Sequence, residues 1–184
     1  MASKATVLRA ELAISDMNRH YYSSHTLTVA QHPSETPERV MMRLVAFALH
    51  ASETLSFTRG LSTEDEPDVW DKDLTDHITL WIDLGQPDEK RIRKACGRAD
   101  RVWLYTYQTR NAGPWWEKMQ SSVARFETLS VAAIDVRDGV LDALFARNMT
   151  LQCTIQDETV TLYSDAGEVT LTVTVWKEAV ARGG

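Results

Sequence analysis

His-Ile-Thr-Leu-Trp-Ile-Asp-Leu-Gly, residues 77–85, is the stretch that decides the fold, because a helix and a second strand are expected directly after it. Its branched and aromatic residues favour a β-strand that ends at Gly85. Residues 88–96 then have the apolar spacing of a helix, and Arg-Val-Trp-Leu-Tyr-Thr at residues 101–106 has the composition of a second strand. A strand, a crossover helix and a strand place the two strands parallel in one sheet. The sequence therefore predicts an α/β fold.

Antiparallel β structure is expected on both sides of this unit. Polar and apolar residues alternate over residues 5–14 and 20–30, around a Ser-Asp-Met-Asn break, which predicts an N-terminal hairpin. Similar patterns predict C-terminal strands at residues 149–156, 159–164 and 169–176, and a further strand at 129–136. A mixed sheet follows from these expectations.

A well-defined helix is expected between the hairpin and the crossover unit. Ser34 or Thr36 can cap it and Pro37 suits its first turn. Apolar residues follow at helical spacing: Met41, Leu44, Val45 and Ala48. Shorter helices are expected around Trp115 and at residues 140–145, and residues 55–61 have the composition of a short strand. The acidic segment 64–76 is interpreted as a loop that contributes nothing to the core.

The composition favours one domain over residues 1–184. The 184 residues include 20 basic and 26 acidic side chains, a formal charge of −6, and 43% are hydrophobic. An acidic chain needs a local basic patch to bind nucleic acid. Cys96 and Cys153 lie far apart without metal-binding spacing, which favours free thiols in a cytoplasmic protein. No membrane span or secretory signal is expected from the hydropathy pattern.

Two charged features suggest chemistry. Lys90, Lys94 and Arg98 recur at helical spacing with Arg91 beside them, and Asp83 stands where the preceding strand ends. Carboxylates on neighbouring β elements can bind Mg²⁺, and a nearby ammonium can neutralise charge on a phosphate. Asp68, Asp83 and Lys90 are candidates for such a set. The alternative interpretation is a solvated acidic loop and a solvated helix face.

Common catalytic signatures are missing from the sequence. There is no GxxxxGK[ST], GxGxxG, GxSxG or HExxH motif. A calcium loop starting at Asp71 fails, because its sixth residue is Asp76 and its twelfth is Ile82. We therefore assign no histidine to a metal.

Five longer strings resemble a known family. They are His-Pro-Ser-Glu-Thr-Pro-Glu-Arg at 32–39, Phe-Thr-Arg-Gly-Leu at 57–61, Asp-Glu-Pro-Asp at 65–68 with Trp70, Leu-Trp-Ile-Asp-Leu-Gly-Gln-Pro-Asp-Glu at 80–89, and Met-Thr-Leu-Gln-Cys-Thr-Ile-Gln-Asp at 149–157. In this order they resemble the YaeQ family of small bacterial proteins, over nearly the whole chain. The resemblance carries no demonstrated activity with it.

The resemblance implies a restriction-endonuclease-like fold related to the PD-(D/E)XK nucleases: a mixed β-sheet flanked by helices, here with the additional hairpin and C-terminal strands. Glu38 matches the helical Glu of that pattern, Pro67-Asp68 the Pro-Asp, and Asp83 the acid of the Asp/Glu-X-Lys element. The chain departs from the pattern at the lysine, because Gly85 stands in its place.

The first hypothesis for function is a Mg²⁺-dependent nuclease that hydrolyses phosphodiester bonds. In it Asp68 and Asp83 bind the metal, Glu38 supplies a further carboxylate, and Lys90 and Lys94 replace the missing lysine from the crossover helix. A long lysine side chain lets an ammonium reach the same space from another backbone position.

Two alternatives stay open. One is a catalytically inactive module that binds nucleic acid or a protein partner through Lys90, Arg91, Lys94 and Arg98. The other is an enzyme acting on a small phosphorylated molecule in a closed pocket, which suits an acidic chain better than a long duplex does.

Overall fold

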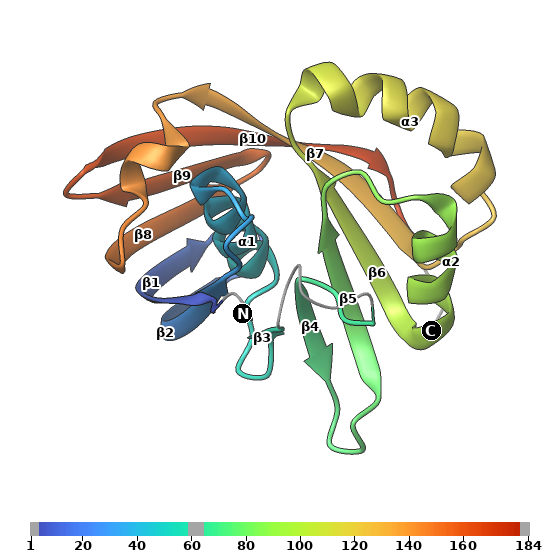
Figure 1. Cartoon of the computed structure of the whole chain (residues 1–184), viewed down its shortest axis with the longest axis horizontal. Coiled ribbons are helices and arrows are strands. Elements are labelled where there is room, and N and C mark those ends of the chain that lie inside the picture. Colours follow the sequence, from blue (N-terminus) through green and yellow to red (C-terminus); the bar gives the residue numbers. More distant parts are fainter. Residues whose placement is uncertain (1–3, 59–64, 181–184) are drawn as a thin grey trace.

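The chain forms one ten-stranded mixed sheet that curls around a helix (Figure 1). The computed structural model describes residues 4–58 and 65–180. The strands are β1 (Thr6–Asp16), β2 (Tyr21–Gln31), β3 (Ser56–Phe57), β4 (Val69–Lys72), β5 (Ile78–Leu84), β6 (Ala99–Thr106), β7 (Leu129–Asp138), β8 (Asn148–Gln156), β9 (Thr159–Ser164) and β10 (Gly167–Lys177). The helices are α1 (Pro37–His50), α2 (Glu89–Arg98), α3 (Thr109–Val123) and the 3₁₀ turn η2 (Leu141–Leu144). The strand order is β2-β1-β8-β9-β10-β7-β6-β5-β4-β3.

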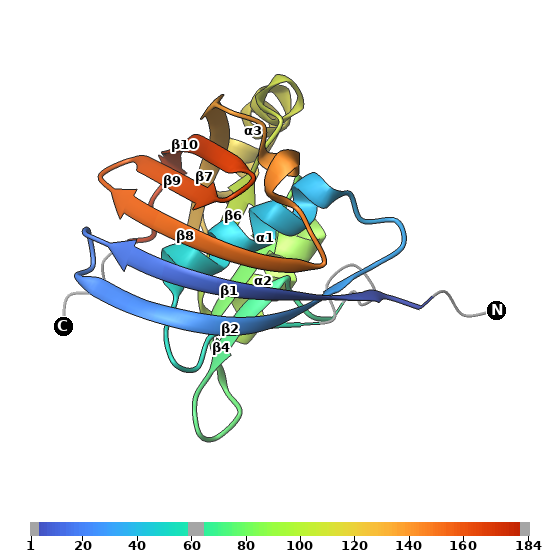
Figure 2. The same cartoon turned by 90° about the vertical axis from the view of Figure 1, so that its left-hand side faces the viewer.

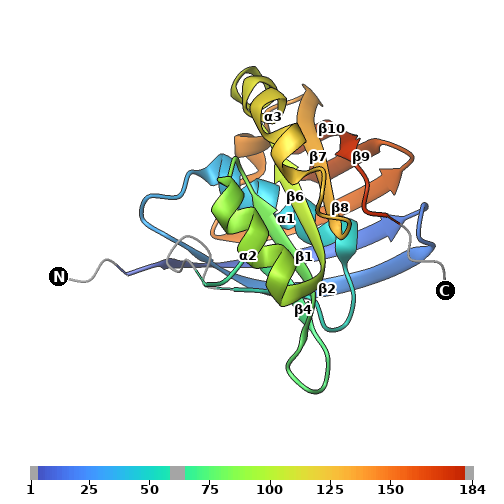
Figure 3. The same ribbon diagram turned by 90° about the vertical axis from the view of Figure 1, so that its right-hand side faces the viewer.

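The predicted crossover unit is confirmed. Strands β5 and β6 are parallel, with Ile82 opposite Trp103, and β6 and β7 are parallel as well. Helices α2 and α3 connect these strands and both lie over the outer face of the sheet (Figure 3). Ile92 and Ala95 of α2 pack there against a cluster of apolar residues that includes Trp81 and Val102. The polar side of α2 is left facing solvent.

The predicted antiparallel elements are also confirmed. Strands β1 and β2 pair without interruption from Thr6–Gln31 to Asp16–Tyr21, and β8, β9 and β10 form an antiparallel meander. Strand β1 joins the two parts through a parallel pairing with β8. Figure 2 shows β2, β1, β8 and β9 side by side in front of α1.

Helix α1 occupies the concave side of the sheet. Thr36 caps its N-terminus, with its hydroxyl accepting from the Arg39 N–H, and nine consecutive residues from Val40 to Ala48 are buried. A helix that is buried all around needs apolar side chains on every side. Its residues pack against inward-facing residues of strands from both halves of the sheet, among them Leu12, Ile82 and Leu171. The sheet therefore curls around α1 and has a separate outer core under α2 and α3.

One local prediction is wrong. Within the segment 64–76, which we expected to be a loop outside the core, β4 pairs with β5, and both Asp68 and Val69 are buried. Strand β4 has only four residues, three of them polar or aromatic, so its pairing depends on contacts with β5 that no local pattern shows. The predicted strand at 55–61 is present as β3, and residues 59–61 lie outside the described residues.

The observed architecture is a mixed α/β fold with a large, nearly closed sheet. A relationship to restriction endonucleases stays a prediction. In the part of the chain that the structure describes, no helix combines the length and the apolar character needed to cross a bilayer.

The C-terminal end of α1 carries a buried histidine. His50 Nε2 lies 2.5 Å from the Tyr105 hydroxyl, and its ring lies beside Trp103. The Arg19 guanidinium donates to the carbonyls of Ala48 and Ala51 at 3.3 and 3.0 Å and so caps the same end of the helix. Burial, assisted by the charge of Arg19, lowers the pKa of His50 to about 3.

This histidine should make the fold sensitive to acid. Its pKa is lower in the folded chain than in the unfolded chain, so the unfolded state binds more protons from about pH 6.5 down to about pH 3 and stability falls across that range. As the pH is lowered through this range, the free energy of unfolding measured in urea should fall more steeply for the wild type than for His50→Gln. The difference between the two slopes should reach up to about 1.4 kcal/mol per pH unit. The control is His77→Gln: Asp100 raises the pKa of exposed His77, so this change should not reduce the acid sensitivity. Equal slopes for wild type and His50→Gln would contradict the prediction.

Candidate functional site

Asp68 and Asp83 are held by the pairing of β4 with β5. Asp83 is the second-last residue of β5, and Asp68 immediately precedes β4. The Asp68 N–H donates to the Ile82 carbonyl at 3.1 Å, and the Leu84 N–H donates to the Asp68 carboxylate at 2.9 Å. Both acids are buried, with 4% and 3% of their surface exposed. The structure therefore places the two predicted acids on neighbouring segments.

Asp68 is paired with an arginine from α1. Arg39 Nη2 donates to both carboxylate oxygens of Asp68, at 2.9 and 3.0 Å, and Nη1 donates to Glu35 at 2.8 Å. Burial by itself would lower the pKa of Arg39, but the two carboxylates outweigh it and raise the pKa. Arg39 thus remains charged and links the start of α1 to the β4–β5 pair.

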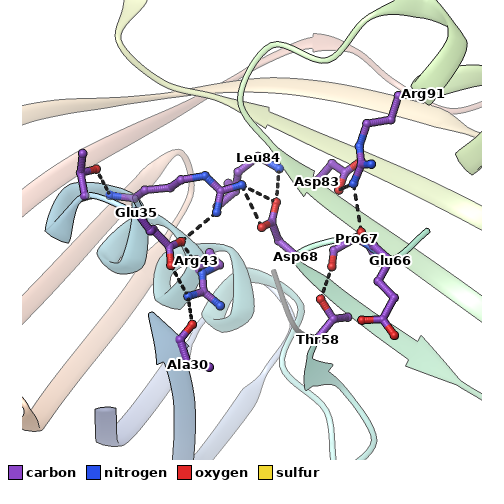
Figure 4. Close-up of polar contacts among 12 residues, drawn as sticks. Ala30, Glu35, Arg43, Thr58, Glu66, Pro67, Asp68, Asp83, Leu84 and Arg91 are labelled. Carbon is purple, nitrogen blue, oxygen red and sulfur yellow. Dashed lines mark hydrogen bonds and ion pairs between the residues drawn. The ribbon is translucent and has the colours of Figure 1, made fainter. Parts of the chain in front are cut away.

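The ion pairs continue into the centre of the molecule through Glu35 and Arg43 (Figure 4). Arg43 is fully buried and donates to both oxygens of Glu35, at 2.7 and 2.9 Å, and to the Ala30 carbonyl of β2 at 2.8 Å. Its guanidinium also lies over the Phe57 ring of β3, 5.8 Å from the centroid. Arg43 therefore contacts both edge strands of the sheet.

Asp83 has a separate arginine from α2. Arg91 donates to its two carboxylate oxygens at 2.9 and 3.1 Å, and Trp81 Nε1 donates to it at 3.0 Å. Arg91 also donates to the Glu66 carbonyl at 3.0 Å, which ties the acidic segment to α2. Burial raises the pKa of Asp83, Arg91 opposes this effect, and the nearby charge of Asp68 adds to it.

As placed, the acids do not form a divalent-cation site. Mg²⁺ takes oxygen ligands in octahedral geometry, whereas the oxygens of Asp68 and Asp83 already accept bonds from guanidinium groups. Among the described residues, no group of three or more His, Cys, Asp or Glu side chains converges in a way that could hold a metal. The set formed by Glu35, Asp68, Asp83 and their three arginines is electrically neutral. Magnesium binding stays a prediction that requires an arginine to move.

Three of the predicted cationic residues, Lys90, Lys94 and Arg98, are exposed on α2. Lys94 binds the Asp65 carboxylate, Arg98 donates to the Asp65 carbonyl at 2.7 Å, and Lys90 is exposed on α2. Arg91, which we expected on the outer contact stripe, is the α2 residue that reaches Asp83. Glu38 is half-buried in the first turn of α1.

The network has three members that were not predicted from the sequence: Glu35, Arg39 and Arg43. Their spacing of four residues was the available signal, since it places charges of opposite sign on one side of a helix or at its start. Such a pattern is typical of an exposed helix face, and only the curled sheet makes it internal.

Removing one member of the Asp68–Arg39 pair should destabilise the fold. Asp68→Asn leaves Arg39 with only one of its two carboxylate partners, Glu35. This change should lower the free energy of unfolding in urea by about 3 kcal/mol. Arg125→Ala is the control, because it breaks the exposed pair with Glu89 and should cost no more than about 0.5 kcal/mol. If Asp68→Asn is as stable as the wild type, the network is not a structural requirement.

Known proteins are similar to this chain in both sequence and fold. The family model described as YaeQ protein matches residues 1–173. The chain is 45% identical over 181 residues to the protein described as "Uncharacterized protein YaeQ" of Escherichia coli (strain K12), covering 97% of this chain and 99% of the relative, and 47% identical over 183 residues to its Salmonella typhi counterpart, with the same coverage.

Two solved structures are similar throughout. The crystal structure of the YaeQ protein from Xanthomonas axonopodis pv. citri has a TM-score of 0.88 and 48% identity, covering 96% of this chain and 99% of that one. The YaeQ protein from Pseudomonas syringae has a TM-score of 0.87 and 33% identity, covering 95% and 97%. Sequence and structure agree over nearly the whole length, and the chain therefore belongs to the YaeQ family.

Proposed function

We propose that this protein is a non-catalytic module that binds the phosphate backbone of nucleic acid through the outer face of α2. The observation that carries the proposal is that Asp68 and Asp83, the two buried acids that a hydrolase would use, are each neutralised by a partly buried arginine, while α2 presents further cations to solvent. The acids support the fold in this proposal, and the helix makes the contact.

Helix α2 is a local basic patch on an acidic protein. From Glu89 to Arg98 it contains five basic residues and one acidic residue, whereas the whole chain has a charge of −6. Glu89 is paired at 2.8 Å with Arg125, which follows the end of α3. Lys90, Arg93 and Lys94 are exposed. Exposed cations on one helix face are suited to phosphates, which are recognised by charge without base specificity.

Metal-dependent hydrolysis is the competing proposal. It needs Asp68 and Asp83 to exchange guanidinium partners for Mg²⁺, which would leave Arg39 with Glu35 as its remaining carboxylate and take the Asp83 carboxylate from Arg91. It also needs Lys90 or Lys94 to supply the ammonium that Gly85 cannot. Each step costs free energy that a preformed metal site would not require.

Binding should weaken steeply with salt and depend on α2. We expect the anisotropy of a fluorescein-labelled 20-nucleotide single strand to report saturable binding whose affinity falls with ionic strength. The double variant Lys90→Ala, Arg93→Ala should make the slope of log K against log[salt] shallower by about 1.4, because each of the two lost phosphate contacts contributes about 0.7.

The matched control is Lys4→Ala with Arg9→Ala, which removes the same charge from exposed positions just before and within β1. In the sheet, β8, β9, β10 and β7 separate β1 from the β5–β6 pair that α2 connects. The control double variant should leave the slope close to that of the wild type. A salt-independent signal, or equal effects of the two double variants, would refute binding through α2.

The same oligonucleotide tests the competing proposal. With Mg²⁺ or Mn²⁺ added, we expect it to remain intact on a denaturing gel after prolonged incubation. Metal-dependent cleavage by the wild type that is lost in both Asp68→Asn and Asp83→Asn, with folding of each variant verified by circular dichroism, would replace the binding module with a nuclease.

A further inference from the structure

Strand β2 is an unusually unprotected sheet edge. It has 11 residues, whereas β3 at the other edge of the sheet has two. Proteins commonly guard a long edge with lysine, proline, an inward charge or a bulge. Residues 21–31 contain no Asp, Glu, Lys, Arg or Pro, and the pairing of β2 with β1 has no register shift. Residues 21–31 therefore lack the features that usually keep a sheet edge from pairing.

The direction of the backbone groups in β1 follows from its contact with β8. The N–H of Arg9 donates to the Arg147 carbonyl and that of Met17 donates to the Ile155 carbonyl, so odd-numbered residues here face β8. Successive residues of a strand direct their backbone groups to opposite sides. Even-numbered residues of β1 therefore bond to β2.

The register carries this alternation into β2. Leu12 pairs with His25 and Leu8 with Val29, so odd-numbered residues of β2 bond to β1. Even-numbered residues therefore direct their N–H and C=O groups to the free edge. The bond from Arg43 to the Ala30 carbonyl confirms this assignment independently.

Four residues then present an open backbone ladder: Tyr22, Ser24, Thr26 and Thr28. Their side chains are exposed on the convex face. Within residues 4–58 and 65–180, no other segment is hydrogen-bonded to their backbone groups. Arg43 closes the ladder at Ala30, so the open part covers about seven residues, the length of an ordinary strand.

The inner side of this edge is apolar and aromatic. The His25 ring meets the Phe47 ring edge-on, with 5.2 Å between the ring centroids. The Phe47 ring in turn stacks on the Phe57 ring of β3, again with 5.2 Å between centroids. Burial lowers the pKa of His25, which keeps it uncharged at neutral pH. Side chains thus join β2 to β3 where no backbone bonds do.

We propose that β2 binds an extended, uncharged peptide segment of another protein, which adds to the sheet as an eleventh strand along Tyr22–Thr28. Main-chain bonds supply the affinity in this mode, and alternate side chains supply the specificity. The partner needs apolar residues at alternate positions facing His25 and Leu27, and small or hydroxylic residues facing solvent. A charged peptide would find no side chain of opposite charge on β2, because residues 21–31 contain no Asp, Glu, Lys or Arg.

A single strand suits this edge better than a second copy of the chain does. The sheet is nearly closed, and β3 lies across from β2, with Phe47 and Arg43 of α1 each contacting both strands. If the β2 strand of a second copy paired with this β2, the β1 strand of that copy would follow it into the space where β3 of this chain already lies. An isolated peptide carries no such second strand.

A proline scan of the edge tests the proposal with the full chain. The probe is a fluorescein-labelled Val-Thr-Leu-Thr-Val-Thr-Val peptide, which copies residues 169–175 and has the required alternation. Thr26→Pro removes one free N–H and no bond to β1, and edge strands tolerate proline there. It should weaken peptide binding at least about tenfold, whereas Thr26→Val, which keeps the N–H, should bind like the wild type.

Amide hydrogen exchange locates the contact. With saturating peptide, protection should increase at residues 22, 24, 26 and 28, and a peptide N-methylated at every residue, which has no N–H on either edge, should not bind. The proposal is overturned if no saturable binding occurs up to millimolar peptide, or if Thr26→Pro binds as Thr26→Val does. It is also overturned if sedimentation shows a dimer of the free chain that Thr26→Pro dissociates, which would make a second copy the occupant.

Discussion

The salt-bridged chain from Arg43 through Glu35 and Arg39 to Asp68 is the interaction on which the rest of the structure depends. It begins in the middle of α1 and ends at the β4–β5 pair, and a branch reaches β2 at Ala30. Buried ion pairs add little net stability compared with apolar packing, but they are costly to break and they fix geometry. Here they fix how α1 is oriented inside the sheet.

The orientation matters because the sheet has two unlike parts. The β5–β6–β7 part is parallel and is covered on its outer face by α2 and α3, while strands β8 and β9 and the β1–β2 hairpin have no helix of the described residues over their convex face (Figures 1 and 2). Strand β10 also meets α3 on the outer face, where Trp176 stacks on Trp116. Both parts share α1 on the concave side. One helix thus serves as the core of a curled sheet whose ends nearly meet, and Arg43 and Phe47 occupy the seam between those ends.

Local patterns in the sequence predicted most of the elements, because alternation and helical spacing are direct consequences of which face is buried. The crossover unit, the hairpin and the three C-terminal strands were found this way. Strand β4 was not, since its pairing is decided by β5. The positions of Asp68 and Asp83 on adjoining segments were anticipated, but their arginine partners were not, because Arg39 and Arg43 lie on a helix whose polar residues would ordinarily face water.

The parallel pairing of β1 with β8 has a consequence for how this protein is made. Arg9 lies opposite Asn148, so the first strand of the chain takes its inner neighbour from the last quarter of it. Contacts so distant in sequence slow folding, since a long loop must close before they form. During synthesis the β1–β2 hairpin cannot pair with its inner neighbour until β8 has left the ribosome, and its uncharged outer strand must avoid pairing with other nascent chains throughout that interval.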